Sequence, residues 1–425
     1  MVLPHLQRQT PTALIEALRQ GLNTFVGAEE EGREKSLTVS LDYSFEALSE
    51  RTRQHLPFLA LFSERVFADW LYFFSRDPES EWGQVYREVF GENLQQADWM
   101  AILQEAAAAS IVEPLGATIF QIHPALPWYL RQRLSQQAVK AGVDAADGGI
   151  ANLEKKLLSF YGSLATHYEQ QLISNAEEAS FVLRVEEPNL LQQLRLAEQQ
   201  EDWGNAQYLL QALGELYKRI GRKPELRALC EQGLFQVGIR LSEVRDKGSD
   251  ASEFWMYLQG RKANDALEAA DIDGAREILE ELLAELELLR DPKFGSKIAV
   301  AQHQLGRVAE KQRRFDDAIA LYQKALKIFE DAGDLYSAAR DYYLLGRVAE
   351  AQENYSEALQ YYILTLAIAL EHNQDLIPLS LQALGQMLKQ FGTDNFKSRW
   401  RKITQAECPD EYFSAIQTAS QQSEN

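Results

Sequence analysis

A six-residue sequence occurs twice in this chain, forty residues apart, and this repeat constrains the fold more than any other feature. Residues 305–310 and residues 345–350 both read Leu-Gly-Arg-Val-Ala-Glu. At the same interval, residues 315–318 (Phe-Asp-Asp-Ala) align with residues 355–358 (Tyr-Ser-Glu-Ala). A weaker third copy starts at Leu384 and is one residue short of the period. A fixed period of this length indicates one small structural unit that is stacked several times.

Within each copy, small and large residues are placed as two antiparallel helices require. Gly306 and Ala318 allow the two backbones to approach closely, and Tyr322 fills the adjoining space. The segment 313–316 is too short to connect anything but antiparallel neighbours. The pattern resembles the tetratricopeptide repeat, whose usual length is about 34 residues. The extra length predicts a longer second helix, over residues 315–332.

The same signals continue upstream in weaker form. Ala197 and Ala206 lie nine residues apart, as do Ala309 and Ala318. We therefore predict degenerate helical repeats over residues 151–290, tetratricopeptide repeats over 291–410 and a flexible tail over 411–425. The predicted class is mainly α, with a small N-terminal domain followed by an α-solenoid.

The first third of the chain lacks the period and predicts a different domain. In residues 1–38, Thr10-Pro11 is a good helix start, with Thr as N-cap and Pro at the first helical position. Residues 39–140 predict helices, then a strand-turn-strand, then a closing helix; the expected ranges are 49–62, 67–74, 82–90, 96–110, 111–122 and 124–139. Helices followed by a hairpin are the order of a winged-helix domain, which we place at residues 39–140.

Charge weighs against the DNA-binding role that winged-helix domains often have. The chain has 43 Lys and Arg against 63 Asp and Glu, a net charge of −20. The helix before the hairpin, which would read the groove, contains Asp98 and Glu105 and no Lys or Arg. Phosphates and guanine edges need cationic partners. A DNA-binding transcriptional regulator with the repeats as effector domain remains the alternative, and the charge weighs against nucleic acid as a partner.

Three segments of the N-terminal third resemble the winged-helix domain of bacterial STAND signalling ATPases of the NB-ARC type. They are residues 40–49, residues 56–62 and Ile122-His123-Pro124. Residues 3–18 are similar to the end of the helical domain that precedes it in that family, and residues 209–217 resemble the family's tetratricopeptide sensors. The phosphate-binding Gly-x-x-x-x-Gly-Lys-Ser/Thr loop does not occur in this sequence. We therefore expect the C-terminal half of such a protein, whose nucleotide-binding module is absent or acts in cis or in trans.

His123 is the sharpest single candidate that the resemblance supplies. In the family, a histidine after the winged-helix hairpin contacts the β-phosphate of bound ADP and locks the resting state. His123 sits at that position, so the resemblance implies a latent nucleotide sensor. The alternative is that His123 satisfies backbone groups where the strand meets the helix.

No residue pattern in the sequence supports catalysis, a metal or a cofactor. Neither His-Glu-x-x-His nor Cys-x-x-Cys occurs, and no histidine is placed by sequence beside Cys230 or Cys408. Two cysteines predict no disulfide framework and a reducing compartment, the cytoplasm. The longest apolar run, residues 56–62, is far short of the roughly 20 residues of a membrane span. We expect neither an enzyme nor a membrane protein.

The remaining candidate is a ligand groove along the first helices of the repeats. The family's groove positions map onto one set of side chains in each copy: His303, Arg307 and Lys311; Arg340, Tyr343 and Arg347; and Gln382, Gln386 and Lys389. A cationic strip with a tyrosine would hold an acidic peptide or a carboxylate by charge-assisted hydrogen bonds. The alternative is that Arg307 and Arg347 pair with Glu310 and Glu350 on a solvated face.

Together these features predict a non-catalytic scaffold that binds a peptide or protein trigger in the repeat groove. It would be the sensing and regulatory part of a STAND-type signalling system. In the mechanism that the resemblance implies, the bound trigger shifts how the winged-helix domain packs on the nucleotide-binding module.

Overall fold

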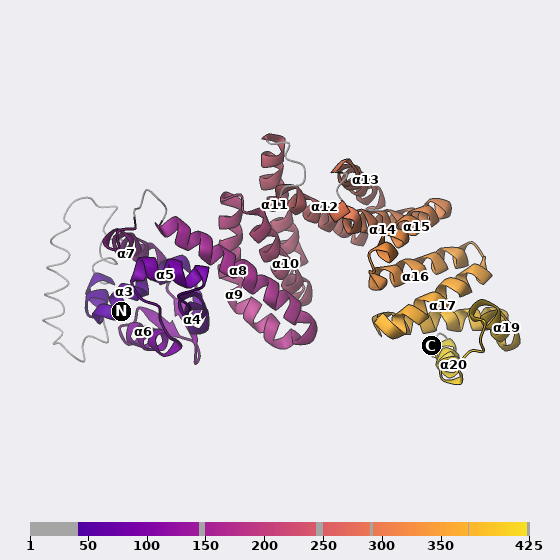
Figure 1. The fold of residues 1–425 in the computed structure, drawn as a ribbon, viewed down its shortest axis with the longest axis horizontal. Coiled ribbons are helices and arrows are strands. Elements are labelled where there is room, and N and C mark those ends of the chain that lie inside the picture. Colours follow the sequence, from indigo (N-terminus) through magenta and orange to yellow (C-terminus); the bar gives the residue numbers. More distant parts are fainter. Residues whose placement is uncertain (1–40, 144–148, 244–249, 290–291, 373, 423–425) are drawn as a thin grey trace. The chain divides into compact units, whose positions relative to one another are not determined.

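The structure is a computed structural model and describes residues 41–143, 149–243, 250–289, 292–372 and 374–422. Its chain divides into two compact units, residues 1–240 and residues 241–425. The predicted class is confirmed, because helices dominate both units and one small sheet lies in the first (Figure 1). The helix expected within residues 1–38 lies outside the described residues. No helix among the described residues is long and apolar enough to cross a bilayer.

Residues 50–140 of unit 1 fold into a small domain that we call the sheet domain. Its elements are α3 (Glu50–His55), the 3-10 helix η3 (Leu56–Leu61), β1 (Arg65–Phe67), α4 (Ala68–Ser75), α5 (Glu81–Phe90), α6 (Gln96–Ala108), β2 (Val112–Pro114), β3 (Ile119–Ile122) and α7 (Leu126–Lys140). β3 is the central strand and pairs antiparallel with both others, with Val66 opposite Phe120 and Val112 opposite Ile122.

The predicted hairpin is present as β2 and β3, and two other expectations for this domain are wrong in detail. Strand β1 (Arg65–Phe67) was not expected; its last residue, Phe67, is the first residue of the predicted 67–74 helix, which begins at Ala68 instead. The continuous helix expected over 49–62 changes to a 3-10 helix at Leu56, because Pro57 has no backbone N–H for an α-helical hydrogen bond. The helices predicted near 82–90, 96–110 and 124–139 are α5, α6 and α7.

Aromatic side chains fill the core of the sheet domain. Phe58 is fully buried at the centre of a cluster with Phe62, Phe74, Tyr86, Phe90 and Trp99, with ring centroids 5.2–6.1 Å apart. The polar groups of the aromatic side chains form hydrogen bonds. Trp99 Nε1 donates to Ser75 Oγ at 2.8 Å, and Tyr86 Oη lies 2.7 Å from His55 Nδ1. Burial lowers the pKa of His55, which favours the neutral ring.

Four helices follow the sheet domain: α8 (Gly149–Ser174), α9 (Ala176–Gln199), α10 (Trp203–Ile220) and α11 (Lys223–Glu243). The first three pack against one another in unit 1. Ala197 and Ala206 are fully buried, as the weak repeat signal requires. Pro188 lies inside α9, where it removes one backbone hydrogen bond.

Unit 2 consists of helix pairs followed by three helices. The pairs are α12 (Asp250–Glu268) with α13 (Ile272–Leu289), α14 (Gly295–Lys311) with α15 (Phe315–Asp331), and α16 (Leu335–Ala351) with α17 (Tyr355–His372); the 3-10 helices η4 (Pro292–Phe294) and η5 (Gln374–Leu376), α18 (Ile377–Phe391), α19 (Thr393–Thr404) and α20 (Asp410–Gln422) complete it. The second helix predicted at 315–332 is α15.

The forty-residue repeat is reproduced atom for atom where the two helices of a pair cross. A methyl group added at Gly306 would lie 2.5 Å from the Tyr322 ring, and one added at Gly346 would lie 2.5 Å from the Tyr362 ring. Each tyrosine is buried, and its hydroxyl donates to a glutamate twelve residues earlier: Tyr322 to Glu310 at 3.0 Å and Tyr362 to Glu350 at 2.7 Å. The glycine and the tyrosine are therefore one packing unit.

The turn inside each helix pair has the same backbone conformation in both units. One residue that is not glycine adopts a positive φ there: Glu201 (57°), Ala270 (61°), Arg313 (58°) and Glu353 (61°). The residue after it donates its N–H to a carbonyl five residues earlier, as Arg314 does to Ala309 at 2.8 Å and Asn354 to Ala349 at 2.8 Å. This left-handed residue ends the first helix and turns the chain back.

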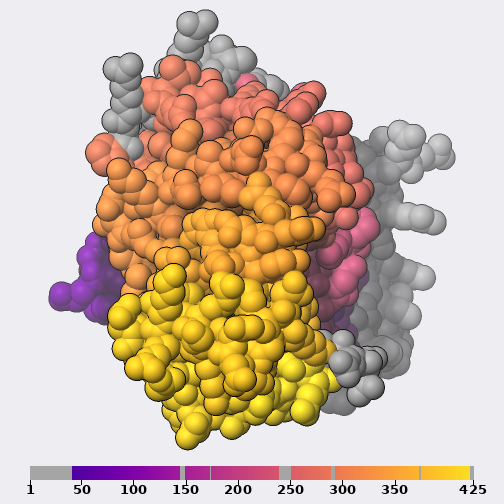
Figure 2. Space-filling model, turned by 90° about the vertical axis from the view of Figure 1, so that its right-hand side faces the viewer, coloured from indigo at the N-terminus to yellow at the C-terminus, as the bar shows by residue number. Residues whose placement is uncertain are grey.

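The flexible tail expected over residues 411–425 is wrong for the described part, because residues 410–422 form α20. Ile416 is fully buried and Phe413 nearly so. α20 crosses α18 at Gly385, where an added methyl would lie 2.8 Å from Ser420 N. Figure 2 shows the C-terminal residues (yellow) as part of one continuous surface with the orange helices of unit 2. The prediction of a flexible tail rested on the polar residues after Ile416 and did not take into account the buried side chains of Phe413 and Ile416.

Candidate functional site

Side-chain contacts link the first helices of successive pairs in unit 2. Between α12 and α14, Gln304 Nε2 donates to Asn264 Oδ1 at 2.8 Å. Between α14 and α16, Arg347 pairs with Glu310 at 2.7 Å, and His303 pairs with Asp341. These helices therefore lie in contact, and the predicted groove residues are carried on α14, α16 and α18.

His303 is not the accessible groove residue that the repeat pattern predicts. It is 8% exposed, and its Nδ1 lies 2.5 Å from Oδ1 of Asp341, which is fully buried. Burial raises the pKa of Asp341, and the contact with His303 opposes that rise. The pair therefore links α14 with α16 through a buried side-chain contact.

The two arginines that lie one repeat apart have different partners. Arg347 forms an ion pair with Glu310 of the preceding repeat, and half of its side chain stays exposed. The alternative expected Arg307 and Arg347 to pair with Glu310 and Glu350, and it agrees only in that an arginine of the strip is paired with one of these glutamates. Arg307 Nη1 donates to Gln304 Oε1 at 2.8 Å. Glu350 accepts the Tyr362 hydroxyl instead. Glu310 thus neutralises part of the predicted cationic strip.

The other predicted groove residues remain accessible. Lys311, Arg340, Gln382, Gln386 and Lys389 are exposed, and Tyr343 is half-buried with its ring 5.8 Å from that of Tyr362. Arg340 lies six residues before Gly346. Among the predicted groove residues, Arg340 is a cation that lies in the N-terminal half of a first helix, α16.

Sequence reasoning missed two apolar residues at the positions equivalent to Arg340. Val300 and Leu379 lie six residues before Gly306 and Gly385, and they are 50% and 42% exposed. The repeat register itself could have identified them. Equivalent positions on consecutive first helices therefore present an apolar, a cationic and a second apolar side chain.

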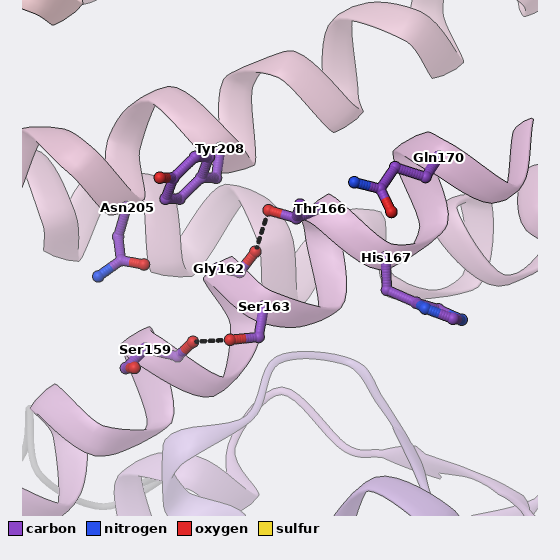
Figure 3. A pocket seen from close by; sticks show the side chains of 8 residues that line it. All are labelled: Ser159, Gly162, Ser163, Thr166, His167, Gln170, Asn205 and Tyr208. Atoms are coloured by element: carbon purple, nitrogen blue, oxygen red, sulfur yellow. Dashed lines mark hydrogen bonds between the residues drawn. The ribbon is translucent and has the colours of Figure 1, made fainter.

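Unit 1 contains a groove of about 530 Å³ that no sequence pattern predicted. Figure 3 shows its lining along one face of α8 and on α10: Ser159, Gly162, Ser163, Thr166, His167, Gln170, Asn205 and Tyr208. A methyl at Gly162 would lie 2.0 Å from Asn205 Oδ1, so glycine lets the two helices meet. Two of the hydroxyls donate to carbonyls of α8 itself, Ser163 at 3.1 Å and Thr166 at 3.0 Å. The lining contains hydroxyl, amide and imidazole groups and no Asp, Glu, Lys or Arg.

His123 is exposed at the junction of β3 and α7. Its Nδ1 lies 3.2 Å from the N–H of Ala125 and accepts from it. This contact is the backbone role that the alternative reading gave to His123. The phosphate-sensing role stays a prediction.

Neither metal-binding nor thiol chemistry is apparent in the part of the chain that the structure describes. No group of three or more His, Cys, Asp or Glu residues in these ranges is arranged to hold a metal ion. Cys230 and Cys408 are both buried, and burial raises the pKa of Cys408 to about 11. A thiol held in the neutral form is a poor nucleophile.

Comparison with known proteins agrees with the repeated packing. Residues 297–371 match the family model described as the tetratricopeptide repeat. The chain contains a tetratricopeptide repeat region. This range covers the two pairs α14–α15 and α16–α17, where the glycine and tyrosine contacts recur. No curated protein matches the chain.

Two solved structures are similar to the chain at low identity. One is BtubC (BKLC) from P. vanneervenii, at 18% identity over 60% of this chain and 92% of that chain, with a TM-score of 0.39. The other is a signal transduction ATPase with numerous domains (STAND) that has a tetratricopeptide repeat sensor, from Pyrococcus horikoshii. Its identity is 13% over 96% of this chain and 69% of that chain, with a TM-score of 0.40.

Proposed function

We propose that this protein is a non-catalytic sensing scaffold that binds a peptide or protein trigger on the first helices of its tetratricopeptide repeats. The observation that carries the proposal is the accessible row formed by Val300, Arg340 and Leu379 on consecutive repeats. Arg340 offers charge-assisted hydrogen bonds, and its two apolar neighbours offer surface that a ligand can bury. A segment with an acidic residue between two apolar residues fits this row.

The sheet domain supports the regulatory part of the proposal. Its hairpin follows the α-helices α3, α4, α5 and α6, and its strand order places β3 between β1 and β2. Together with the resemblance of residues 40–49, 56–62 and 122–124, this order favours a winged-helix element of a STAND-type system. In that system a nucleotide-binding module, in cis or in trans, would be the partner that the trigger controls.

The alternative, a DNA-binding regulator, is not favoured by the side chains of α6. Glu105 accepts from Ser49 Oγ at 2.7 Å and Asp98 accepts from Arg51 Nη1 at 2.7 Å, so acidic groups face the neighbouring loop and helix. α6 has no Lys or Arg. A helix that enters the major groove needs cations for phosphates and bases.

Charge reversal tests the trigger site. We expect the double substitution Arg340→Glu and Arg307→Glu to weaken binding of a fluorescein-labelled peptide rich in Glu and Leu by about tenfold, since each exposed contact contributes up to about 1 kcal/mol. The measurement is fluorescence anisotropy at two salt concentrations. The matched control is Lys324→Glu with Lys327→Glu on α15, which changes the net charge equally and is exposed. An equal loss in both double variants would refute the groove and leave only a general charge effect.

Nucleotide titration tests the regulatory assignment separately. The sequence lacks a phosphate-binding glycine loop with its lysine. We therefore expect isothermal titration of this chain with ATP or ADP to give no binding in the micromolar range. Micromolar affinity of this chain for ATP or ADP would contradict the proposal that a separate module binds the nucleotide.

A further inference from the structure

Buried polar side chains of α8 and α9 hold the sheet domain in unit 1. Asn189 Oδ1 accepts from the N–H of Ser63 at 2.6 Å, and its Nδ2 donates to the carbonyl of Arg65 at 2.9 Å. The same amide donates to Glu186 Oε2 at 2.8 Å, and the Tyr161 hydroxyl donates to that oxygen at 2.9 Å. Asn189 thus clamps the backbone at the beginning of β1, and Glu186 positions Asn189.

The centre of this cluster is sealed from solvent. Glu186 and Tyr161 are fully buried and Asn189 is 1% exposed. The second carboxyl oxygen, Glu186 Oε1, has no hydrogen-bond partner among the described residues, and neither has the buried Trp70 Nε1 of α4. The Trp70 indole is a weak donor to this carboxyl group, and ionisation would place a charge in a buried site that holds no cation beside it, which is costly.

The surroundings of Glu186 favour the neutral acid. Burial raises the pKa of Glu186 to about 7, although hydrogen bonds from Asn189, Tyr161 and Trp70 favour the charged form. The groups that face it are Asn189 of α9, Tyr161 and Tyr168 of α8 and Trp70 of α4. None of them is a cation. Ionisation therefore occurs within a neutral pH range and without a compensating charge.

Helix α9, which carries Glu186 and Asn189, lacks one backbone hydrogen bond because a proline lies between these two residues. Pro188 stands between Glu186 and Asn189 and cannot donate a backbone hydrogen bond to the preceding turn of α9. Prolines inside helices are common sites of bending. Local opening at this turn would bring water to Glu186 and release Asn189 from β1 together.

We propose that Glu186, Asn189 and Tyr161 form a proton-controlled joint between the sheet domain and helices α8 and α9. With Glu186 neutral the joint is closed. Loss of its proton favours an open form, in which water hydrates the carboxylate and Asn189 no longer holds the backbone of residues 63 and 65. The sheet domain is then free to change its packing on the helices without unfolding.

Amide hydrogen exchange of the full chain tests the joint directly, because the N–H of Ser63 is one of its donors. An acid whose pKa is about 7 in the closed form and about 4.5 in the open form is protonated more in the closed form. The open population should then rise about tenfold per pH unit between pH 5 and pH 7 and level off above pH 7. We expect this profile, after correction for the intrinsic exchange rate, in peptides that cover residues 61–67.

Substitutions distinguish the joint from a general effect of a buried acid. Glu186→Gln should remove the pH dependence and keep residues 61–67 protected. The matched control is Glu198→Gln, since Glu198 is a second buried glutamate of α9 that is bonded to Gln232 and not to the sheet domain. It should retain the profile of the unmodified chain.

A second variant keeps the proposal testable if Glu186→Gln fails to fold. Tyr161→Phe removes one donor to the carboxylate, which favours the neutral acid further, so the plateau should move to higher pH. The proposal is overturned if exchange at residues 61–67 is independent of pH in the unmodified chain, if Glu186→Gln or Tyr161→Phe leaves the profile unchanged, or if the core peptides of α5 and α6 follow the same profile. The last result would mean that the whole domain unfolds.

Discussion

Replacing Tyr362 with alanine is expected to lower the free energy of unfolding of unit 2 by about 3–5 kcal/mol, the range observed when a buried aromatic side chain is truncated. The Tyr362 ring fills the space above Gly346, and its hydroxyl satisfies Glu350. Truncation leaves a cavity between α16 and α17 and an acceptor without its donor. Denaturant titration followed by circular dichroism, together with hydrogen exchange of α16 and α17 peptides, measures the loss.

Two related substitutions show whether the ring or the hydroxyl matters. Tyr362→Phe keeps the ring and removes one hydrogen bond to a partly exposed acid, so it should cost only about 1 kcal/mol. Tyr322→Ala repeats the experiment in the preceding pair, where Gly306 and Glu310 take the same places, and should cost as much as Tyr362→Ala. A loss below 1 kcal/mol in both alanine variants would mean that the glycine and tyrosine contact does not hold the pairs together.

Gly385→Ala is expected to detach α20 from α18 and to lower the stability of the C-terminal end of unit 2 by about 2–3 kcal/mol. The added methyl would lie 2.8 Å from Ser420 N and 3.2 Å from the carbonyl oxygen of Ile416. These are backbone atoms of a helix, so they cannot move aside as a flexible side chain would. Detachment exposes Phe413 and Ile416, and limited proteolysis between α19 and α20 should become faster.

Gly260→Ala is the matched control for this substitution. Gly260 lies inside α12, and an added methyl there would meet no atom within 4 Å. Alanine favours the helix over glycine by up to about 1 kcal/mol, so this variant should be slightly stabilised. Equal changes in stability and in proteolysis rate for Gly385→Ala and Gly260→Ala would contradict the close approach of α20 at Gly385.

The helix pairs were predictable because their signal is local. Gly306, Ala318 and Tyr322 lie within one unit of the repeat, and a repeated unit repeats its packing. The hairpin was predictable for the same reason, since β2 and β3 are separated by a four-residue turn. Elements whose partners lie far along the chain were missed. Strand β1 has only three residues and pairs with β3, more than fifty residues later.

The candidate groove was predicted only in part, because its mapping assumed that equivalent positions have equivalent surroundings. His303 is buried against Asp341. The residue that occupies the place of Asp341 one repeat earlier is Ala301, which has no carboxyl group. A pair of side chains that occurs once in the array leaves no repeated pattern to recognise. The ion pair of Arg347 with Glu310 could be anticipated, since both residues belong to the repeated motif.

The joint at Glu186 left no signal in the sequence. An isolated glutamate in a helix of an acidic chain is usually solvated, and only the fold shows that Tyr161 and Ser63 meet α9 at this point. Burial, not composition, changes the chemistry of this carboxyl group.

The left-handed residue at the turn of each helix pair bears on how such a chain can change during evolution. Glu201, Ala270, Arg313 and Glu353 adopt nearly the same φ although three different residue types occupy the position, so the turn does not depend on one particular side chain. A gene duplication or deletion with both ends at such turns would join segments that have nearly the same φ at the turn. The array can therefore gain or lose whole helix pairs while the existing turns still connect the helices. A breakpoint inside a helix would instead separate a glycine from the tyrosine that packs on it.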